Sequence, residues 1–122
     1  NSTDFGDLSR ARYNLFSCSN PIRGLFAGGY VAPGSSNIID YITISTIGNA
    51  TDFGDLTVAR EGGSACSSPT RGVFADGVVT PTGNVNVIDY VTISTQGNAV
   101  DFGDRTEARN KIFGCSNAHG GL

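Results

Sequence analysis

The chain has 122 residues, enough for one domain with a modest core, and this length argues against a multidomain enzyme. Eight Lys and Arg residues against eleven Asp and Glu residues give a net charge of −3, which argues against a nucleic-acid-binding protein that relies on phosphate contacts. The sequence lacks a run of about 18 apolar residues, so it predicts no membrane insertion.

An internal repeat organises the chain. The tetrapeptide Asp-Phe-Gly-Asp begins at positions 4, 52 and 101, at offsets of 48 and 49 residues. One repeat domain, 1–122, therefore contains two full copies, 4–51 and 52–100, and a partial third copy, 101–122.

Each copy is predicted to form four short β-strands and no helix. β-Branched and aromatic residues bounded by Asn, Gly and Pro are typical of strands separated by turns. In the first copy, in chain order, the strands are expected at 12–18, 23–27, 37–46 and about 50–56. In the second copy they are expected at 60–66, 71–75 and 86–95, with counterparts of the fourth strand at the two ends of the chain, each carrying DFGD, and a last strand at 109–115. Four strands in about 48 residues is the size of one propeller blade.

Apolar side chains are predicted on both faces of the third strand of the first copy. Ile38, Ile42 and Ile44 share one face, and Ile39 and Tyr41 share the other. A sheet with one solvated face would alternate apolar and polar residues, so a neighbour is expected on each side. Propeller blades meet this condition, and a stacked β-solenoid is the alternative.

The order of these features resembles the kelch-type repeat of β-propellers. A strand ending in Gly28-Gly29 precedes a variable loop, a strand centred on Asp40-Tyr41, and an aromatic strand with Phe53. The second copy departs from the pattern, with Asp76-Gly77 in place of the double glycine, and Phe stands where kelch blades usually have Trp. The wording IDYxTISTxGNAxDFGD is also similar to repeats in structural and tail-fibre-like proteins of marine bacteriophages, and this implies a virion or extracellular location.

The kelch resemblance implies an all-β fold of four-stranded antiparallel blades with a period of 48–49 residues. Propellers have at least about four blades, so one chain supplies an incomplete ring. Either the sequence is an excerpt of a longer chain, or copies associate into a homo-oligomer, because isolated blades expose edges and apolar faces.

Three sets of repeated residues are predicted to be structural. Opposite charges that recur once per copy are most simply an ion-pair or hydrogen-bond network. Phenylalanine in the DFGD motif is expected to pack between blades. The residues are Arg12, Arg60 and Arg109, with Asp40 and Asp89 as their acidic partners, and Phe5, Phe53 and Phe102.

No catalytic, cofactor or metal site is predicted. The DFG triplet of kinases occurs here without the other kinase motifs, and the calcium-loop spacing of acidic residues is absent. One cysteine per copy, Cys18, Cys66 and Cys115, lacks the close spacing of zinc ligands, and disulfides between equivalent positions of neighbouring blades are not expected. A reactive cysteine would need a nearby base, and the sole histidine, His119, belongs to the partial third copy. The chain is therefore expected not to be an enzyme.

Two loops that differ between the copies, 30–36 and 78–85, are the predicted binding surface, because propellers place binding groups on variable loops. The candidate ligand-binding residues are Tyr30, Asn37, Thr82 and Asn86. The expected function is a structural or adhesion repeat module of a virion or tail-fibre-type assembly that contacts other proteins or a host surface. The alternatives are a glycan-binding, lectin-like propeller that binds cell-surface glycans, and a self-assembling extracellular fibre subunit.

Overall fold

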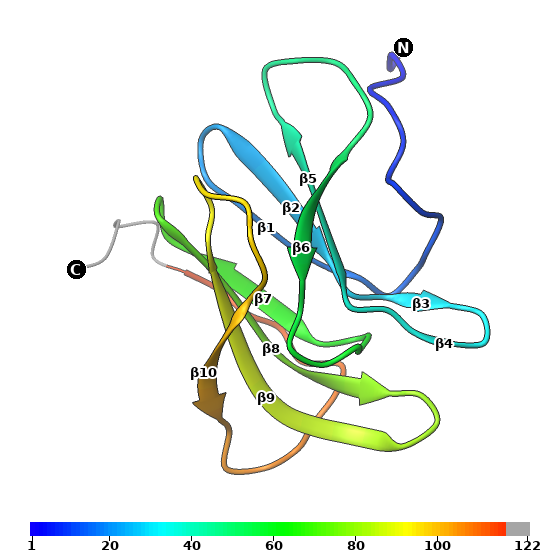
Figure 1. Cartoon of the computed structure of the whole chain (residues 1–122), viewed down its shortest axis with the longest axis vertical. Helices are drawn as coiled ribbons and strands as arrows, with labels where there is room; N and C mark the ends of the chain where they lie inside the picture. Colours follow the sequence, from blue (N-terminus) through cyan, green and yellow to red (C-terminus); the bar gives the residue numbers. More distant parts are fainter. Residues whose placement is uncertain (117–122) are drawn as a thin grey trace.

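The computed structural model describes residues 1–116, and this part of the chain is all-β, with antiparallel strands and no helix. The strands form two four-stranded sheets and one short hairpin (Figure 1). The all-β expectation is thus confirmed. His119 lies outside the described residues.

The first sheet comes from the first copy and the start of the second. Its strand order is β1-β2-β5-β6. The four strands are β1 (Phe16–Ser19), β2 (Arg23–Ala27), β5 (Ile38–Thr43) and β6 (Thr51–Asp55). Between β2 and β5 the chain forms a separate hairpin of β3 (Tyr30–Val31) and β4 (Gly34–Ser35). The strands of the sheet follow one another along the chain, so each connection is a turn or hairpin.

The second sheet repeats this plan, with the strand order β7-β8-β9-β10. Its strands are β7 (Ser64–Ser67), β8 (Arg71–Val79), β9 (Gly83–Thr92) and β10 (Val100–Asp104). β8 and β9 are longer than their counterparts because they continue into the hairpin that Gly28 and Gly29 separate from the first sheet. At the position of Gly28 the second sheet has Asp76, with φ of 59°, and the ladder shifts register there.

The core lies between the two sheets. β1 lies against β7 and β8, and the rings of Phe16 and Phe74 are 6.3 Å apart. Leu25, at 0% exposure, lies over Gly72 of β8. The remaining buried apolar residues of this core are Ala27, Ile39, Phe53, Leu56, Val91, Ile93 and Ala99.

The sheets contribute opposite faces to this core. We name the face of each sheet that carries Leu25 or its counterpart Val73 the rear face, and the opposite face the front face. The first sheet buries its rear face, whereas the second sheet buries its front face, which carries Phe74. The two repeats therefore stack in the same orientation, front against rear, and not face to face about a twofold axis.

Two strand predictions were wrong. The segment 109–115 and the N-terminal DFGD segment contain no strand in the structure. A strand needs a hydrogen-bonded partner. The equivalents of the N-terminal segment, β6 and β10, pair with β5 and β9, and the equivalents of 109–115, β1 and β7, pair with β2 and β8. Within residues 1–116 neither segment has such a partner strand. The search of the described residues for membrane-spanning segments finds no helix long and apolar enough to cross a membrane.

Candidate functional site

The DFGD motif makes the contact that joins one sheet to the next. In β6, Phe53 O accepts a hydrogen bond from Gly97 N at 2.8 Å, and Asp55 O accepts one from Ala99 N at 2.8 Å. Asp55 N donates in return to Oδ1 of Asn98 at 3.0 Å. The motif in the first sheet thus holds the Gly-Asn-Ala loop of the second sheet by three hydrogen bonds.

Glycine at the centre of the motif lets the two backbones approach. A Cβ on Gly54 would lie 2.4 Å from Gly97 O, and the φ of Gly54 is 147°, a conformation that residues with a side chain rarely adopt. Asp52 Oδ1 accepts a hydrogen bond from Gly54 N, which fixes the turn within the motif. The tetrapeptide therefore acts as a docking element.

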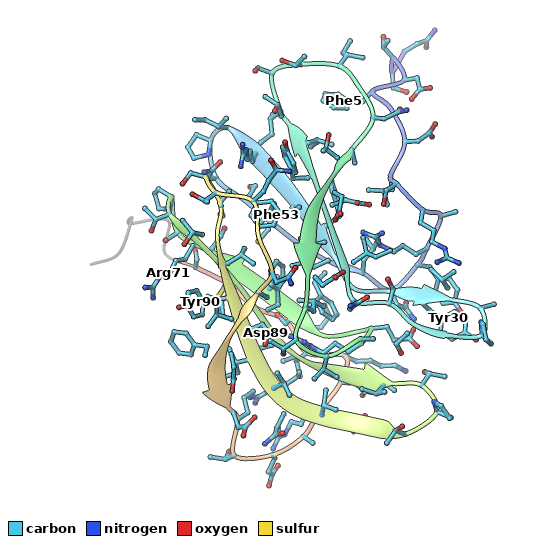
Figure 2. The ribbon with its side chains drawn as sticks, in the orientation of Figure 1. Phe5, Tyr30, Phe53, Arg71, Asp89 and Tyr90 are labelled. Carbon is cyan, nitrogen blue, oxygen red and sulfur yellow. The ribbon has the colours of Figure 1, made fainter. Side chains whose placement is uncertain are left out.

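A buried ion pair follows the docking element. The Arg60 side chain is fully buried, and its Nη1 lies 2.8 Å from Oδ2 of Asp89. Its Nε and Nη2 donate to the carbonyl oxygens of Asp76 and Phe74 in β8. Thr57 Oγ1 donates to the same Asp89 carboxylate at 2.6 Å. Figure 2 shows Asp89 and Phe53 within the stack of the two sheets. Charges that are buried without water need such partners, and each of these has them.

The N-terminal segment makes the equivalent backbone contacts and ion pair with the first sheet. Phe5 O and Asp7 O accept hydrogen bonds from Gly48 N and Ala50 N, and Asp7 N donates to Oδ1 of Asn49. Ser9 Oγ donates to the carboxylate of Asp40, and Nη1 of Arg12 lies 3.1 Å from Asp40 Oδ2. We therefore name residues 4–12, 52–60 and 101–109 donor segments. The Gly-Asn-Ala loop and the buried aspartate of the sheet that receives one form an acceptor site.

The third donor segment, 101–109, has no acceptor among the described residues. The Phe102 side chain is 58% exposed, whereas Phe53 is 3% exposed, although both rings stand edge-on to a tyrosine ring at 5.9 Å. Arg109 donates to the neighbouring Glu107 at the surface, and this hydrogen bond lowers the pKa of the Glu107 carboxyl. Arg109 therefore differs from Arg12 and Arg60, because it pairs with its own segment.

The four candidate ligand-binding residues do not come together at one site. Tyr30 stacks against Tyr13, with ring centroids 5.2 Å apart, in β3. Asn86 Nδ2 donates to Arg105 O, and at the equivalent position Asn37 O accepts a hydrogen bond from Leu56 N. These two asparagines hold the chain after the fourth strand. Thr82 lies exposed in the turn between β8 and β9.

Sequence reasoning missed the acceptor residues Asn49 and Asn98 and the role of glycine in the motif. The available signal was the recurrence of Gly-Asn-Ala in both full copies, but this sequence is also typical of an ordinary turn. It also missed Arg23, whose guanidinium lies 4.6 Å from the Tyr41 ring centroid and donates from Nη1 to Ile93 O across the junction. Arg71 lies over the Tyr90 ring at 4.8 Å, at the equivalent place in the second sheet (Figure 2).

The three cysteines stand at equivalent positions of the repeat. Cys18 in β1 and Cys66 in β7 are free thiols on adjacent strands, and Cys115 is exposed. Burial, with a smaller contribution from Cys66, raises the pKa of Cys18 to about 12. Cys18 is therefore a protonated, unreactive thiol at neutral pH.

Residues 1–116 contain no cluster of three or more His, Cys, Asp or Glu side chains that could hold a metal ion. In comparisons with known proteins, no family model matches the chain and no curated protein sequence is found to match it. The contacts that recur in the structure are those that bind one repeat to the next.

Proposed function

We propose that the chain is a non-catalytic repeat module, a structural or adhesion part in which each four-stranded sheet is a propeller blade. The junction between the sheets is the observation that carries this proposal. Its buried ion pair, its docking element and its loop recur at the first sheet with the N-terminal segment as donor. Charged side chains that recur in the copies and are used in structural contacts favour a scaffold rather than a catalytic site.

The order of the strands supports the assignment to blades. Each sheet runs as a meander, and the first strands of the two sheets, β1 and β7, lie against each other. This is the arrangement expected when first strands line the centre of a ring. Because propellers have roughly four to eight blades, two to four copies of this two-sheet chain, or further repeats in a longer chain, would complete a ring.

The two variable hairpins supply a surface for contacts. The β3–β4 hairpin and the end of the β8–β9 hairpin lie side by side on one edge of the molecule (Figure 1). Ser35 joins them, because its Oγ accepts from Thr80 N at 2.9 Å and contacts Val78 O at 3.3 Å. A surface assembled from the variable loops of successive repeats suits recognition. We place it in a virion or tail-fibre-type assembly on the similarity of the repeat wording.

Light scattering on the purified chain tests the module. We expect a mass that grows with concentration toward a discrete small multiple of 12.6 kDa, as a closed ring requires. Unlimited growth would favour the fibre-subunit alternative. A monomer at every accessible concentration would overturn blade closure between copies.

Glycan binding is the second candidate, and the tyrosine pair beside the first hairpin favours it. Tyr13 is 59% exposed and lies on Tyr30, so an aromatic face is open to solvent next to a variable loop. Aromatic faces supply large contact areas at low entropic cost. A panel of immobilised glycans should then retain the wild-type chain and not Tyr13→Ala. Tyr90→Ala, which changes a tyrosine outside this pair, is the control variant.

A further inference from the structure

We propose that donor segment 4–12 is a plug in the acceptor site of the first sheet, and that donor segment 101–109 of a second copy displaces it. This exchange joins the chains head to tail. The inference rests on the proposed function, and it names the partner as a second copy of this chain and the site as the loop 48–50 with Asp40.

The acceptor site of the second sheet shows how a donor segment binds when it belongs to a complete sheet. There, the donor segment 52–60 arrives as part of a complete sheet and buries the rear face of that sheet against the front face of the next. At the first sheet, the plug is the only donor segment among residues 1–116. Ile44 on this front face is 46% exposed, whereas Ile93 at the equivalent position is 0% exposed. The front face of the first sheet is therefore left without its cover.

The plug is held less firmly at the first sheet than segment 52–60 is at the second sheet. Segment 52–60 is also fixed to its own sheet, because β6, which carries the docking element, pairs with β5. Residues 4–7 belong to no strand. Arg60 donates from Nε to Asp76 O, whereas Nε of Arg12, whose side chain is buried, has no hydrogen-bond partner beside the ion pair with Asp40. Buried polar groups without partners are costly, so displacement of the plug relieves this cost.

The third donor segment carries every group that the acceptor site binds. Asp101-Phe102-Gly103-Asp104 repeats the docking element, Thr106 stands in the place of Thr57, and Arg109 in the place of Arg60. β10 already pairs with β9, so this segment is ordered before it docks. A Cβ on Gly103 would meet no atom within 4 Å, whereas a Cβ on Gly6 would lie 2.4 Å from Gly48 O. The space that a Gly-Asn-Ala loop fills at the other two motifs is open here.

The sheet behind this donor brings a matching rear face. Arg71 lies over Tyr90 as Arg23 lies over Tyr41, so its guanidinium is placed to donate to the Ile44 carbonyl of a second copy, as Arg23 does to that of Ile93. Two positions of the donor segment differ, since Glu107 replaces Val58 and Arg105 replaces Leu56. The Arg105 guanidinium is bound to buried Asp76, and this pairing compensates the charge.

Association of this kind is heterologous, because different faces of the two copies meet. A heterologous contact gives a ring if the rotation closes and a filament if it does not. At such a junction, segment 101–109 of one copy and segment 4–12 of the other would occupy the same acceptor site. For that reason the plug must leave before the sheets stack.

Three glycine substitutions in the full chain test the exchange by sedimentation velocity across a concentration series. Gly6→Ala places a Cβ against Gly48 O and should expel the plug, lowering the apparent dissociation constant by about tenfold or more. Gly103→Ala should abolish association, because its Cβ would meet the loop 48–50 of the second copy. Gly83→Ala is the matched control, with a φ of 121°, near the 139° of Gly103, and equally open space in a hairpin outside the junction.

Circular dichroism of each variant checks that the sheets are retained. The double variant Gly6→Ala/Gly103→Ala should be monomeric alone, and in a mixture it should stop the growth of Gly6→Ala assemblies, because it accepts a donor and offers none. Association that Gly103→Ala leaves intact would overturn the exchange while preserving the module. Failure of both wild type and Gly6→Ala to associate would overturn the exchange and closure between copies together.

Discussion

Arg60 and Asp89 are charged side chains with no exposure, a state that the bulk of charged residues avoid. The guanidinium is satisfied by one carboxylate and by backbone carbonyl oxygens of β8. Removal of one partner leaves the other buried and uncompensated, which is far more costly than loss of an exposed pair.

Arg60→Met should therefore lower the free energy of unfolding by about 3–5 kcal/mol. Urea titration of this variant measures the loss, and Arg60→Met/Asp89→Leu should recover part of it because the unpaired carboxylate is gone. Arg71→Met, which removes an exposed guanidinium from the Tyr90 ring, is the control and should cost about 1 kcal/mol or less. Equal stability of Arg60→Met and wild type would contradict a structural role of the buried pair.

Cys18 is expected to lower the stability of the folded chain at alkaline pH. Burial raises the pKa of its thiol from the ordinary 9.0 to about 12, so below pH 9 the group is protonated in both the folded and the unfolded state. Between pH 9 and about 12 only the unfolded state loses the proton. This difference favours unfolding by up to about 1.4 kcal/mol for each pH unit in that window.

Cys18→Ala should flatten this part of the stability profile. Denaturant unfolding of both proteins from pH 8 to pH 11 checks it, since tyrosine ionisation affects the two chains alike. The stability difference between wild type and variant should be constant up to about pH 9 and then shift in favour of the variant. Parallel profiles throughout the range would contradict the assignment.

At the scale of elements, the copies keep the same backbone conformation at equivalent positions, even where their residues differ. Asn14, Gly62 and Lys111 occupy equivalent positions, and their φ values are 56°, 64° and 53°. The docking glycines Gly6, Gly54 and Gly103 share φ values between 139° and 147°. Connections and docking elements thus keep one geometry in every copy, which lets the same contact be made repeatedly.

Gly54→Ala should be strongly destabilising, because its Cβ would meet Gly97 O at 2.4 Å and the backbone conformation is unfavourable for alanine. We expect a loss of at least about 3 kcal/mol, with the sheets separated in part. Thermal melting measures it. Gly83→Ala carries a comparable backbone cost without a clash and should lose less. If both variants melt alike, the close approach is not what selects glycine.

At the scale of the whole molecule, two equivalent repeats have different surroundings. The rear face of the first sheet and the front face of the second sheet form the core, while the remaining front and rear faces are open. Ile93 and Ile44 show the contrast. Each isoleucine directly follows the third strand of its sheet, β9 or β5, and Ile93 is 0% exposed whereas Ile44 is 46% exposed.

Ile93→Ala should lower the free energy of unfolding by about 2–5 kcal/mol, as expected for a fully buried isoleucine. Ile44→Ala should change monomer stability by much less and weaken association instead. Thermal melting and sedimentation velocity on both variants separate the two effects. Association that is unaffected by Ile44→Ala would exclude this front face as a docking surface.

The sequence by itself determined the all-β class, the period and most strand positions, because turn residues and β-branched runs act locally. It also singled out Arg60, Asp89 and Phe53 as repeated residues. Tertiary structure decided which residues they meet, since the ion pair of Arg60 with Asp89 and the hydrogen bonds of the docking element with the loop 97–99 join residues some 29 to 44 positions apart. It also decided that DFGD begins no strand at residue 4 and does so at residue 52, because a ladder forms only where the rest of the sheet is present.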